Sequence, residues 1–509
     1  MSPRAFIRRS IWEEKLLNPF GAGLLALLAV GVAWVVGQYG LLPGLLLVAA
    51  IVGIPTLYGT VAYPKQGIVI LLVASFLLFY VIRMGIDFPV GTVMDGLEWL
   101  LVLGTILARR RVTGPSVFGS TIGFIILVWV LYTVLQVLNP WAASKMAWLY
   151  TVRTVGAVTL MYFVFVANID SVKYLRMLIW LWIGLALVGA LYGFKQELLG
   201  FTPAEFQELI SDPKMIDLLF IDGHWRKYSI FSDPVAFAYN MVMVALICLS
   251  LIQIHKGFLQ KSALILIALF CVVAMLFSGT RGGYVLIPAG FVLFFILRFN
   301  RTLLMLAAIG AFAFIILIKI PTGNPTLYRF QTAFRPTDDP SFNLRTYNQK
   351  RIQPYIQQHP FGGGLGATGV WGVRFAPDSF LASFPPDSGY VRVAVEMGWV
   401  GLLLFCTLIF IILKKGIDHF FLIRNEELKA YCLAMTIVVF VLGIGSYPQE
   451  AIVQFPSNIL FYLAAAIIQV SLQLDATVAA PDLPEEERSG LTPADSGAGT
   501  GRNFSAIGT

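Results

Sequence analysis

The chain has 509 residues, of which 58% are hydrophobic and only 13% are charged, and its mean hydropathy is +0.79. This composition excludes a soluble globular protein of this length and is typical of a polytopic membrane protein. The formal net charge is +8, and a basic, non-hydrophobic stretch from about Pro321 to Ser388 interrupts the apolar segments, which indicates contact with an anionic partner.

Apolar segments long enough to cross a bilayer recur along most of the chain and predict an all-α fold with about 12 to 14 transmembrane helices. They lie at residues 20–37, 41–62, 67–82, 90–108, 117–137, 152–168, 174–194, 233–254, 262–278, 283–298, 302–319, 389–413, 429–446 and 456–473. The first lacks a small-residue cleavage site and is followed by many more spans, so we interpret it as an anchor and not as a signal peptide.

The distribution of lysine and arginine predicts the orientation, because short cytoplasmic loops retain positive charge. Arg4, Arg8, Arg9 and Lys15 place the N-terminus inside, and if the helices then alternate, every later inside loop is also basic. Those loops carry Lys65, Arg109, Arg110, Arg111, Lys173, Lys256, Lys261, Arg298, Arg301, Lys414, Lys415 and Arg424. The same alternation places residues 195–232 and 320–388 outside. Their lysines and arginines run against the usual bias of outside loops, so we expect a local function for them.

The cysteines and the C-terminal segment carry no sign of chemistry. Cys248, Cys271, Cys406 and Cys432 all fall within expected spans, and neither a disulfide framework nor a metal-ligand spacing is present. We therefore expect no metal and no cofactor. Residues 475–509 are rich in Pro, Glu, Ser, Gly and Thr, which predicts a disordered cytoplasmic tail after a membrane domain over 1–474.

The first outside loop ends in a basic segment at a helix start. Asp233 is expected to cap that helix and Pro234 to occupy its first position. Arg226 and Lys227 would then lie near a helix N-terminus, whose N–H groups and partial positive charge attract anions. The alternative is a solvated basic loop.

Arg281 lies in a short outside turn, Ser278–Gly283, directly before the next span. Glycines let a ligand approach the backbone, so a phosphate suits this helix N-terminus. The alternative is an arginine whose head group reaches the membrane interface while its stem lies in the apolar layer.

The long outside loop carries Arg345 and Arg351, six residues apart, before the glycine-rich segment His359–Gly366. Both arginines could reach one bound polyanion. The glycine run resembles a phosphate cradle, but no Walker lysine and Ser/Thr follow it, and a tight turn is the alternative.

The last candidate is Asp387, which precedes the span beginning near Gly389. One interpretation is a helix N-cap; another is a general base for a sugar hydroxyl, and the two are compatible. Arg392 and Glu396 are one helical turn apart, which predicts an internal ion pair. Mutual pairing is also expected among Arg153, Asp95 and Glu98.

Taken in order and spacing, four of these stretches resemble the O-antigen ligase and polymerase superfamily of bacterial membrane enzymes. They are Arg226–Pro234, Ser278–Gly283, Arg345 onward through His359–Gly366, and Asp387–Leu402. Ligases of the family usually have a His-Asn pair where this chain has Asp387-Ser388, which leaves open whether the acceptor is lipid A core.

The resemblance implies a GT-C-like, metal-independent glycosyltransferase in the bacterial inner membrane with its active site on the periplasmic face. Its partners would be an undecaprenyl-diphosphate-linked glycan donor, a glycan or lipid-linked acceptor and membrane lipids, with no nucleic acid. The expected catalytic residues are Arg226, Arg281 and Asp387. The expected substrate-binding residues are Lys227, Arg345, Arg351, His359, Gly364 and Glu396.

Three alternatives to an O-antigen ligase-like enzyme stay open at this point. A repeat-unit polymerase of the same superfamily would use the same chemistry. A polysaccharide or lipid transporter is expected to concentrate charges and broken helices at mid-membrane in both halves of the chain. A non-catalytic scaffold for polysaccharide export would tolerate substitution of the arginines.

Overall fold

A computed structural model describes residues 19–40, 51, 53, 55–83, 90–109, 119–211, 213–221, 223–299 and 340–479, with scattered positions between 305 and 334. Most of the spans expected at 41–62 and 302–319, and the expected tail beyond residue 479, lie outside the described residues. Residues 475–479 belong to the last helix.

The predicted all-α polytopic membrane fold is confirmed. Within the described residues, eleven helices are long and apolar enough to cross a membrane. They are α2 (Pro19–Tyr39), α4 (Pro64–Arg83), α5 (Val90–Arg109), α6 (Thr121–Leu135), α7 (Lys145–Asn168), α8 (Val172–Leu198), α11 (Pro234–Leu251), α12 (Phe258–Phe277), α18 (Gly389–Leu422), α19 (Glu426–Gly445) and α20 (Ser457–Ala479). A further apolar helix, α13 (Arg281–Leu297), is shorter and contains Pro288.

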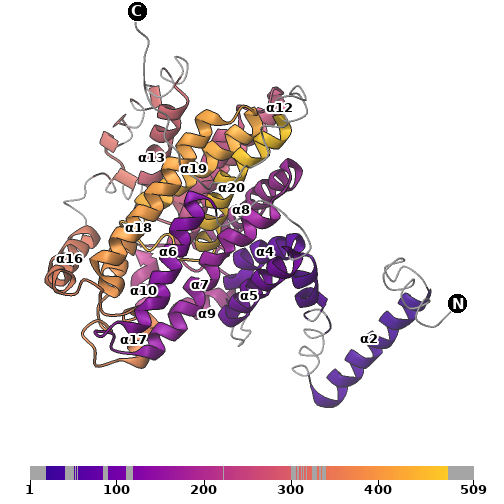
Figure 1. Ribbon diagram of the computed structural model, residues 1–509, viewed down its shortest axis with the longest axis horizontal. Coiled ribbons are helices and arrows are strands. Elements are labelled where there is room, and N and C mark those ends of the chain that lie inside the picture. Colours follow the sequence, from indigo (N-terminus) through magenta and orange to yellow (C-terminus); the bar gives the residue numbers. More distant parts are fainter. Residues whose placement is uncertain are drawn as a thin grey trace, which may run out of the picture.

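The remaining described elements connect the spans, and all of them except α16 are short. They are η2 (Gln136–Leu138), α9 (Pro203–Ser211), α10 (Pro213–Leu219), the antiparallel strands β1 (Phe220–Ile221) and β2 (His224–Trp225), α16 (Pro340–Gln358) and α17 (Gly369–Phe375). Figure 1 shows α16 and α17 together at one end of the bundle, at lower left. We call this the α16 end.

Burial divides the spans into a centre and a periphery. Nearly all of α11 is buried, as is most of α19 and α20, whereas α2 is almost wholly exposed and stands apart from the bundle at lower right in Figure 1. Helices that are apolar on every side are typical of positions surrounded by other helices or by lipid. The site described below is built on and around this central group.

Loops gather at two ends, as alternating spans require. Loops predicted to be cytoplasmic pair with one another at one end, through Lys65–Asp170, Arg176–Glu427 and Arg298–Glu426. At the α16 end, Arg226 contacts the 278–280 turn, and Arg281, which follows that turn, lines one cavity together with Arg345 of α16. The two segments predicted to lie outside are therefore at the same end of the bundle.

A break in α18 fixes the glycine-rich segment against the bundle. Gly398 has φ 72° and ψ −176° inside this helix, a conformation that residues with a Cβ rarely adopt. The break frees backbone groups that need partners. The Gly363 N–H donates to Val395 O at 2.8 Å, the Gly364 N–H to Glu396 O at 2.9 Å, and the Val400 N–H to Pro360 O at 3.3 Å.

This packing predicts that Gly398→Ala destabilises the fold. An added Cβ would lie 1.9 Å from Pro360 O, and a residue held at an unfavourable positive φ costs about 1–3 kcal/mol before any clash. We expect a clearly lower melting temperature in detergent.

The matched control is Gly184→Ala in α8, where nothing lies within 4 Å of the added Cβ. Alanine is preferred to glycine inside a helix by roughly 0.5–1 kcal/mol, so this variant should melt at the wild-type temperature or above it. Equal melting temperatures for Gly398→Ala and Gly184→Ala would contradict the packing described at the break in α18.

Candidate functional site

Two of the predicted basic segments are in direct contact. Arg226 donates from Nε to Ser278 O at 2.9 Å and from Nη2 to Thr280 Oγ1 at 3.1 Å. Thr280 is the N-cap of α13, and Arg281 is the first residue of that helix. The Arg226 guanidinium therefore braces the turn that carries Arg281.

The helix that follows this loop starts as the sequence predicts. The Asp233 carboxylate accepts hydrogen bonds from the Val235 and Ala236 N–H groups at 2.8 and 3.0 Å, and Pro234 occupies the first helical position. The predicted cap is confirmed, and it fixes the end of the basic loop on the central helix α11.

Lys227 points into the protein at this level. Its ammonium donates to Trp225 O at 3.0 Å and lies 3.3 Å from the Glu197 carboxylate. Burial lowers the pKa of Lys227, and the charge of Glu197 opposes that effect. The ammonium is thus compensated by Glu197, and among the described residues Lys227 does not line the cavity described below.

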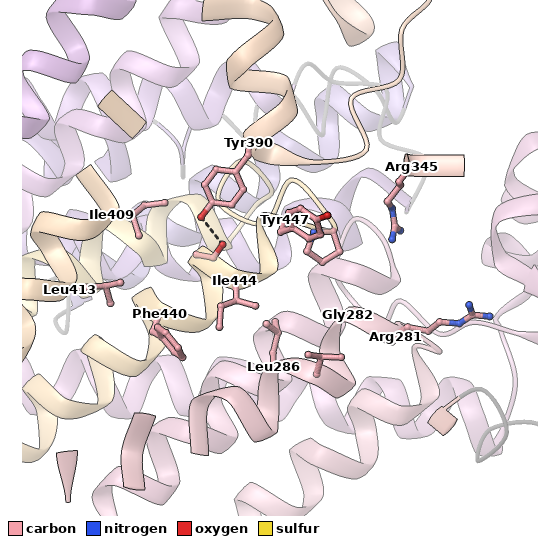
Figure 2. Close-up of a pocket in the computed structure, with 13 residues that line it drawn as sticks. Arg281, Gly282, Leu286, Arg345, Tyr390, Ile409, Leu413, Phe440, Ile444 and Tyr447 are labelled. Atoms are coloured by element: carbon pink, nitrogen blue, oxygen red, sulfur yellow. Dashed lines mark hydrogen bonds between the residues drawn. The ribbon is translucent and has the colours of Figure 1, made fainter. Parts of the chain in front are cut away.

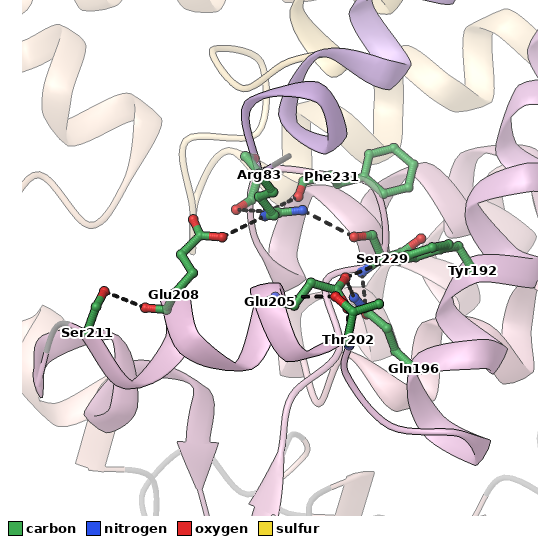
Figure 3. Close-up of polar contacts among 10 residues, drawn as sticks. Arg83, Tyr192, Gln196, Thr202, Glu205, Glu208, Ser211, Ser229 and Phe231 are labelled. Carbon is green, nitrogen blue, oxygen red and sulfur yellow. Dashed lines mark hydrogen bonds and ion pairs between the residues drawn. The ribbon is translucent and has the colours of Figure 1, made fainter. Parts of the chain in front are cut away.

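The basic loop is anchored by Arg83, a residue that the sequence analysis missed. Its guanidinium donates to Ser229 O at 3.2 Å, to Ser232 O at 3.0 Å and to Phe231 O (Figure 3). It also lies over the Tyr228 ring, 4.1 Å from the ring centroid. Because an arginine at the outer end of a span opposes the positive-inside rule, that position was the available signal.

A buried carboxylate holds the same loop from the other side (Figure 3). Glu205 accepts from the Thr202 N–H at 2.7 Å, from Gln196 Nε2 at 2.8 Å and from Tyr192 OH at 3.0 Å. Burial acts to raise the pKa of Glu205, but these hydrogen bonds outweigh it and lower the pKa. Gln196 in turn accepts from the Ser229 N–H at 2.8 Å, so the loop is positioned by both α4 and α8.

A cavity of about 640 Å³ opens beside the Arg281 turn. Figure 2 shows Arg281 and Arg345 at one side of it, with Leu413 and Phe440 at the other. The other lining residues belong mainly to α13, α18 and α19, and they include Gly282, Val285, Leu286, Tyr390, Ile409, Ile444 and Tyr447. The cavity therefore has two arginines at one side and a long apolar wall at the other, and the Arg281 side chain extends away from that wall in Figure 2.

The two arginines of α16 lie in different surroundings. Arg345 lines the cavity, whereas the Arg351 guanidinium lies 5.5 Å from the Phe380 ring centroid and 5.9 Å from that of Phe384. His359, at the end of the same helix, stacks on Tyr355 at 4.0 Å. Of the bases expected from the long loop, only Arg345 reaches the cavity among the described residues.

The glycine-rich segment has a structural role in this fold. Besides the amides of Gly363 and Gly364, which are used on α18 carbonyls, the Gly366 N–H donates to Glu396 Oε2 at 3.0 Å. An added Cβ at Gly364 would lie 2.6 Å from that of Ala142. These three amides are occupied within the protein and do not form the phosphate cradle that the sequence suggested.

Glu396 is the buried anchor of that segment and has an ion-pair partner. The predicted pair is confirmed, with Arg392 Nε 3.2 Å from Glu396 Oε1. Arg392 also lies 2.5 Å from Glu450, which the sequence analysis did not single out. Burial raises the pKa of the Glu450 carboxyl, against the effect of Arg392.

The predicted pairing between α5 and α7 is also present, with Arg153 Nε 2.8 Å from Asp95 Oδ2. Glu98 is wholly buried on α5, and none of the described residues donates a hydrogen bond to its carboxylate. Asp95 and Arg153 thus form a pair that excludes Glu98, which corrects the expectation for the third residue.

Asp387 is not a helix cap. The helix α18 begins at Gly389, and its N-cap is Ser388. The Asp387 carboxylate instead accepts a hydrogen bond from Asn348 Nδ2 of α16 at 3.2 Å, and the side chain is half-buried. Asp387 precedes Tyr390, which lines the cavity, by three residues, but Asp387 is not itself among the lining residues.

Within the described ranges, no group of three or more His, Cys, Asp or Glu side chains is placed to hold a metal ion. The polar chemistry of the cavity comes from arginine, tyrosine and the neighbouring Asp387. Such a set can bind an anion, orient hydroxyl groups and accept a proton.

Residues 266–406 match the family model described as O-Antigen ligase. The match covers Arg281, Arg345 and Asp387, and it confirms the resemblance to the O-antigen ligase and polymerase superfamily. The match supports a membrane protein of ligase or polymerase type that handles glycans. No match to the chain was found among curated proteins.

Proposed function

We propose that the protein transfers a glycan from an undecaprenyl-diphosphate carrier to an acceptor sugar on the outer face of the bacterial inner membrane. The observation that carries this proposal is the cavity in which Arg281 and Arg345 meet an apolar wall. A glycan-linked polyprenyl diphosphate has two matching parts, a dianionic head group that complements the arginines and a hydrocarbon chain that complements the apolar wall. The proposed active site is thus the cavity together with the adjoining outside loops.

The head group is assigned to the end of the cavity that carries the arginines. A guanidinium can donate two parallel hydrogen bonds to phosphate oxygens. Arg281 also begins α13, and Gly282, the next residue, lines the cavity, so the partial positive charge of the helix N-terminus adds to the attraction. Arg226 acts indirectly, because it braces the turn that precedes Arg281.

The hydrocarbon chain is assigned to the wall between α18 and α19. Ile409, Leu413, Phe440 and Ile444 line the cavity away from the arginines, and burial of apolar surface contributes about 25 cal/mol per Å². This end faces the membrane-spanning part of both helices. A carrier lipid could therefore occupy the cavity with its chain still at membrane depth.

The transfer step needs a base and a stabilised leaving group. The acceptor hydroxyl oxygen forms the new bond to the anomeric carbon, while the bond from that carbon to the diphosphate oxygen breaks and its electron pair leaves with the diphosphate. The hydroxyl proton passes to Asp387. Arg281 and Arg345 stabilise the charge that develops on the leaving group, so the proposed reaction does not rely on a metal.

The position of the charges favours transfer over transport. A transporter is expected to hold its substrate near the bilayer midplane between two repeats, whereas Arg345 of this cavity belongs to α16 and Arg281 is at the first position of α13. Ligase and polymerase share the chemistry above. The family description favours a ligase, and the Asp387-Ser388 pair in place of His-Asn favours a polymerase.

The first test removes the positive charges of the two cavity arginines. Arg281→Ala and Arg345→Ala should each lower glycan transfer by about 100- to 1000-fold, the typical cost of losing a group aimed at developing negative charge. Arg281→Lys should rescue poorly because an ammonium cannot make the bidentate contact. The measurement is transfer from a purified lipid-linked glycan, with melting temperature in detergent as the folding check.

Arg351→Ala is the matched comparison, because Arg351 is on the same helix but stacks on Phe380 and Phe384 outside the cavity. We expect it to retain most of the activity. Wild-type turnover in Arg281→Ala, or equal losses in Arg345→Ala and Arg351→Ala, would remove the basis for the assigned anion site.

A second test concerns the base. Asp387→Asn keeps an oxygen that can accept from Asn348 but cannot take a proton, so transfer should fall by about 100-fold or more while the melting temperature stays the same. Asp378→Asn, at an exposed position of the same outside segment, should stay close to wild type. Full activity in Asp387→Asn would assign the base elsewhere.

A further inference from the structure

A second cavity, of about 450 Å³, lies between α16 and α18. Tyr390 and Tyr447 line both this cavity and the one that holds Arg281 and Arg345. The two cavities are thus neighbours that share a pair of aromatic side chains. A molecule in one can lie next to a molecule in the other.

The wall contributed by α16 is mixed, with four polar residues, of which one is charged, and two isoleucines. Thr346, Gln349, Lys350 and Gln353 line the cavity together with Ile352 and Ile356, and the spacing of three and four residues puts the polar four on one face of the helix. Glutamine amides both donate and accept hydrogen bonds, as sugar hydroxyls do. Among the described lining residues there is no carboxylate and no arginine.

The opposite wall is formed by small and apolar side chains of α18, namely Val391, Ala394 and Leu402. Together with the rings of Tyr390 and Tyr447, this wall suits the C–H faces of a sugar ring, which are apolar. The second cavity therefore differs in kind from the first. The first cavity combines two arginines with a long apolar wall, whereas the second combines glutamine amides with a shorter apolar wall.

The candidate base belongs to a segment that meets the second cavity, although Asp387 itself is not among the residues that line either cavity. Ser388, which lines the second cavity, directly follows Asp387, and Asp387 is hydrogen-bonded to Asn348 on α16, next to Gln349. A saccharide hydroxyl at the Ser388 end of this cavity would be close to a proton acceptor.

We infer that the cavity between α16 and α18 is the binding site of the acceptor saccharide, and that Gln349 and Gln353 recognise its hydroxyl groups. This inference rests on the proposed glycan transfer. It assigns the diphosphate and the hydrocarbon chain to the first cavity and the acceptor sugar to the second, with Asp387, which precedes Ser388 of that cavity, to receive the hydroxyl proton.

The kinetic test is the double variant Gln349→Ala/Gln353→Ala. Loss of two hydrogen-bonding side chains should raise the KM for the acceptor by about tenfold or more, with the KM for the lipid-linked donor and the kcat little changed. Gln357→Ala is the matched control, because Gln357 is exposed on the same helix and does not line the cavity. A raised donor KM with an unchanged acceptor KM would overturn the assignment.

A binding test that needs no turnover separates this inference from the proposed function. In a Cys406→Ala background, which removes the exposed native cysteine, Gln353→Cys is labelled with a membrane-impermeant maleimide. The probe is the oligosaccharide fraction that mild acid releases from membranes of the cells that express the protein. We expect the oligosaccharide to slow labelling of Gln353→Cys several-fold and to leave Gln357→Cys unaffected.

The same protection should persist when Arg281→Ala is added, because that arginine belongs to the other cavity. Inactivity of the wild-type enzyme would count against glycan transfer, whereas protection would still report saccharide in the second cavity. Labelling of Gln353→Cys at the same rate with and without the oligosaccharide, in both backgrounds, would overturn the inference.

Discussion

Charge held at the end of a membrane bundle has to be paired or hydrogen-bonded, and this requirement organises the site. The Arg83 guanidinium is used on three carbonyls of the 229–232 segment, that of Arg226 on the turn before α13, and that of Arg392 on Glu396 and Glu450. These contacts fix loops from distant parts of the chain at one level. Arg281 and Arg345 are thereby placed on a shared cavity.

Much of this arrangement could be predicted because it follows from local physical rules. Span positions follow from runs of apolar residues, the Asp233 cap from helix-start chemistry, and the Arg392–Glu396 pair from its spacing of four residues. The positive-inside rule also predicted which loops would meet. The contact of Arg226 with the 278–280 turn agrees with that alternation.

Other features depend on tertiary contacts that no local pattern reports. The glycine-rich segment allowed either a phosphate cradle or a tight turn, and nothing in its sequence indicated that its amides serve the break in α18 at Gly398. Asp387 reads as a cap, yet the helix begins two residues later and the carboxylate contacts α16. Arg83 and Glu450 belong to none of the sequence motifs described above. In each case the partner lies far away in sequence, and only the packing of helices identifies it.

The central claim is that the cavity of Arg281 and Arg345 holds a polyprenyl diphosphate, and direct binding tests it most simply. Undecaprenyl diphosphate and undecaprenol, both without glycan, would be titrated against the purified protein and its Arg281→Ala variant. We expect the diphosphate to bind the wild type much more tightly than the alcohol, and we expect Arg281→Ala to remove most of this difference. Equal affinity for the two lipids, or an unchanged preference in the variant, would contradict it.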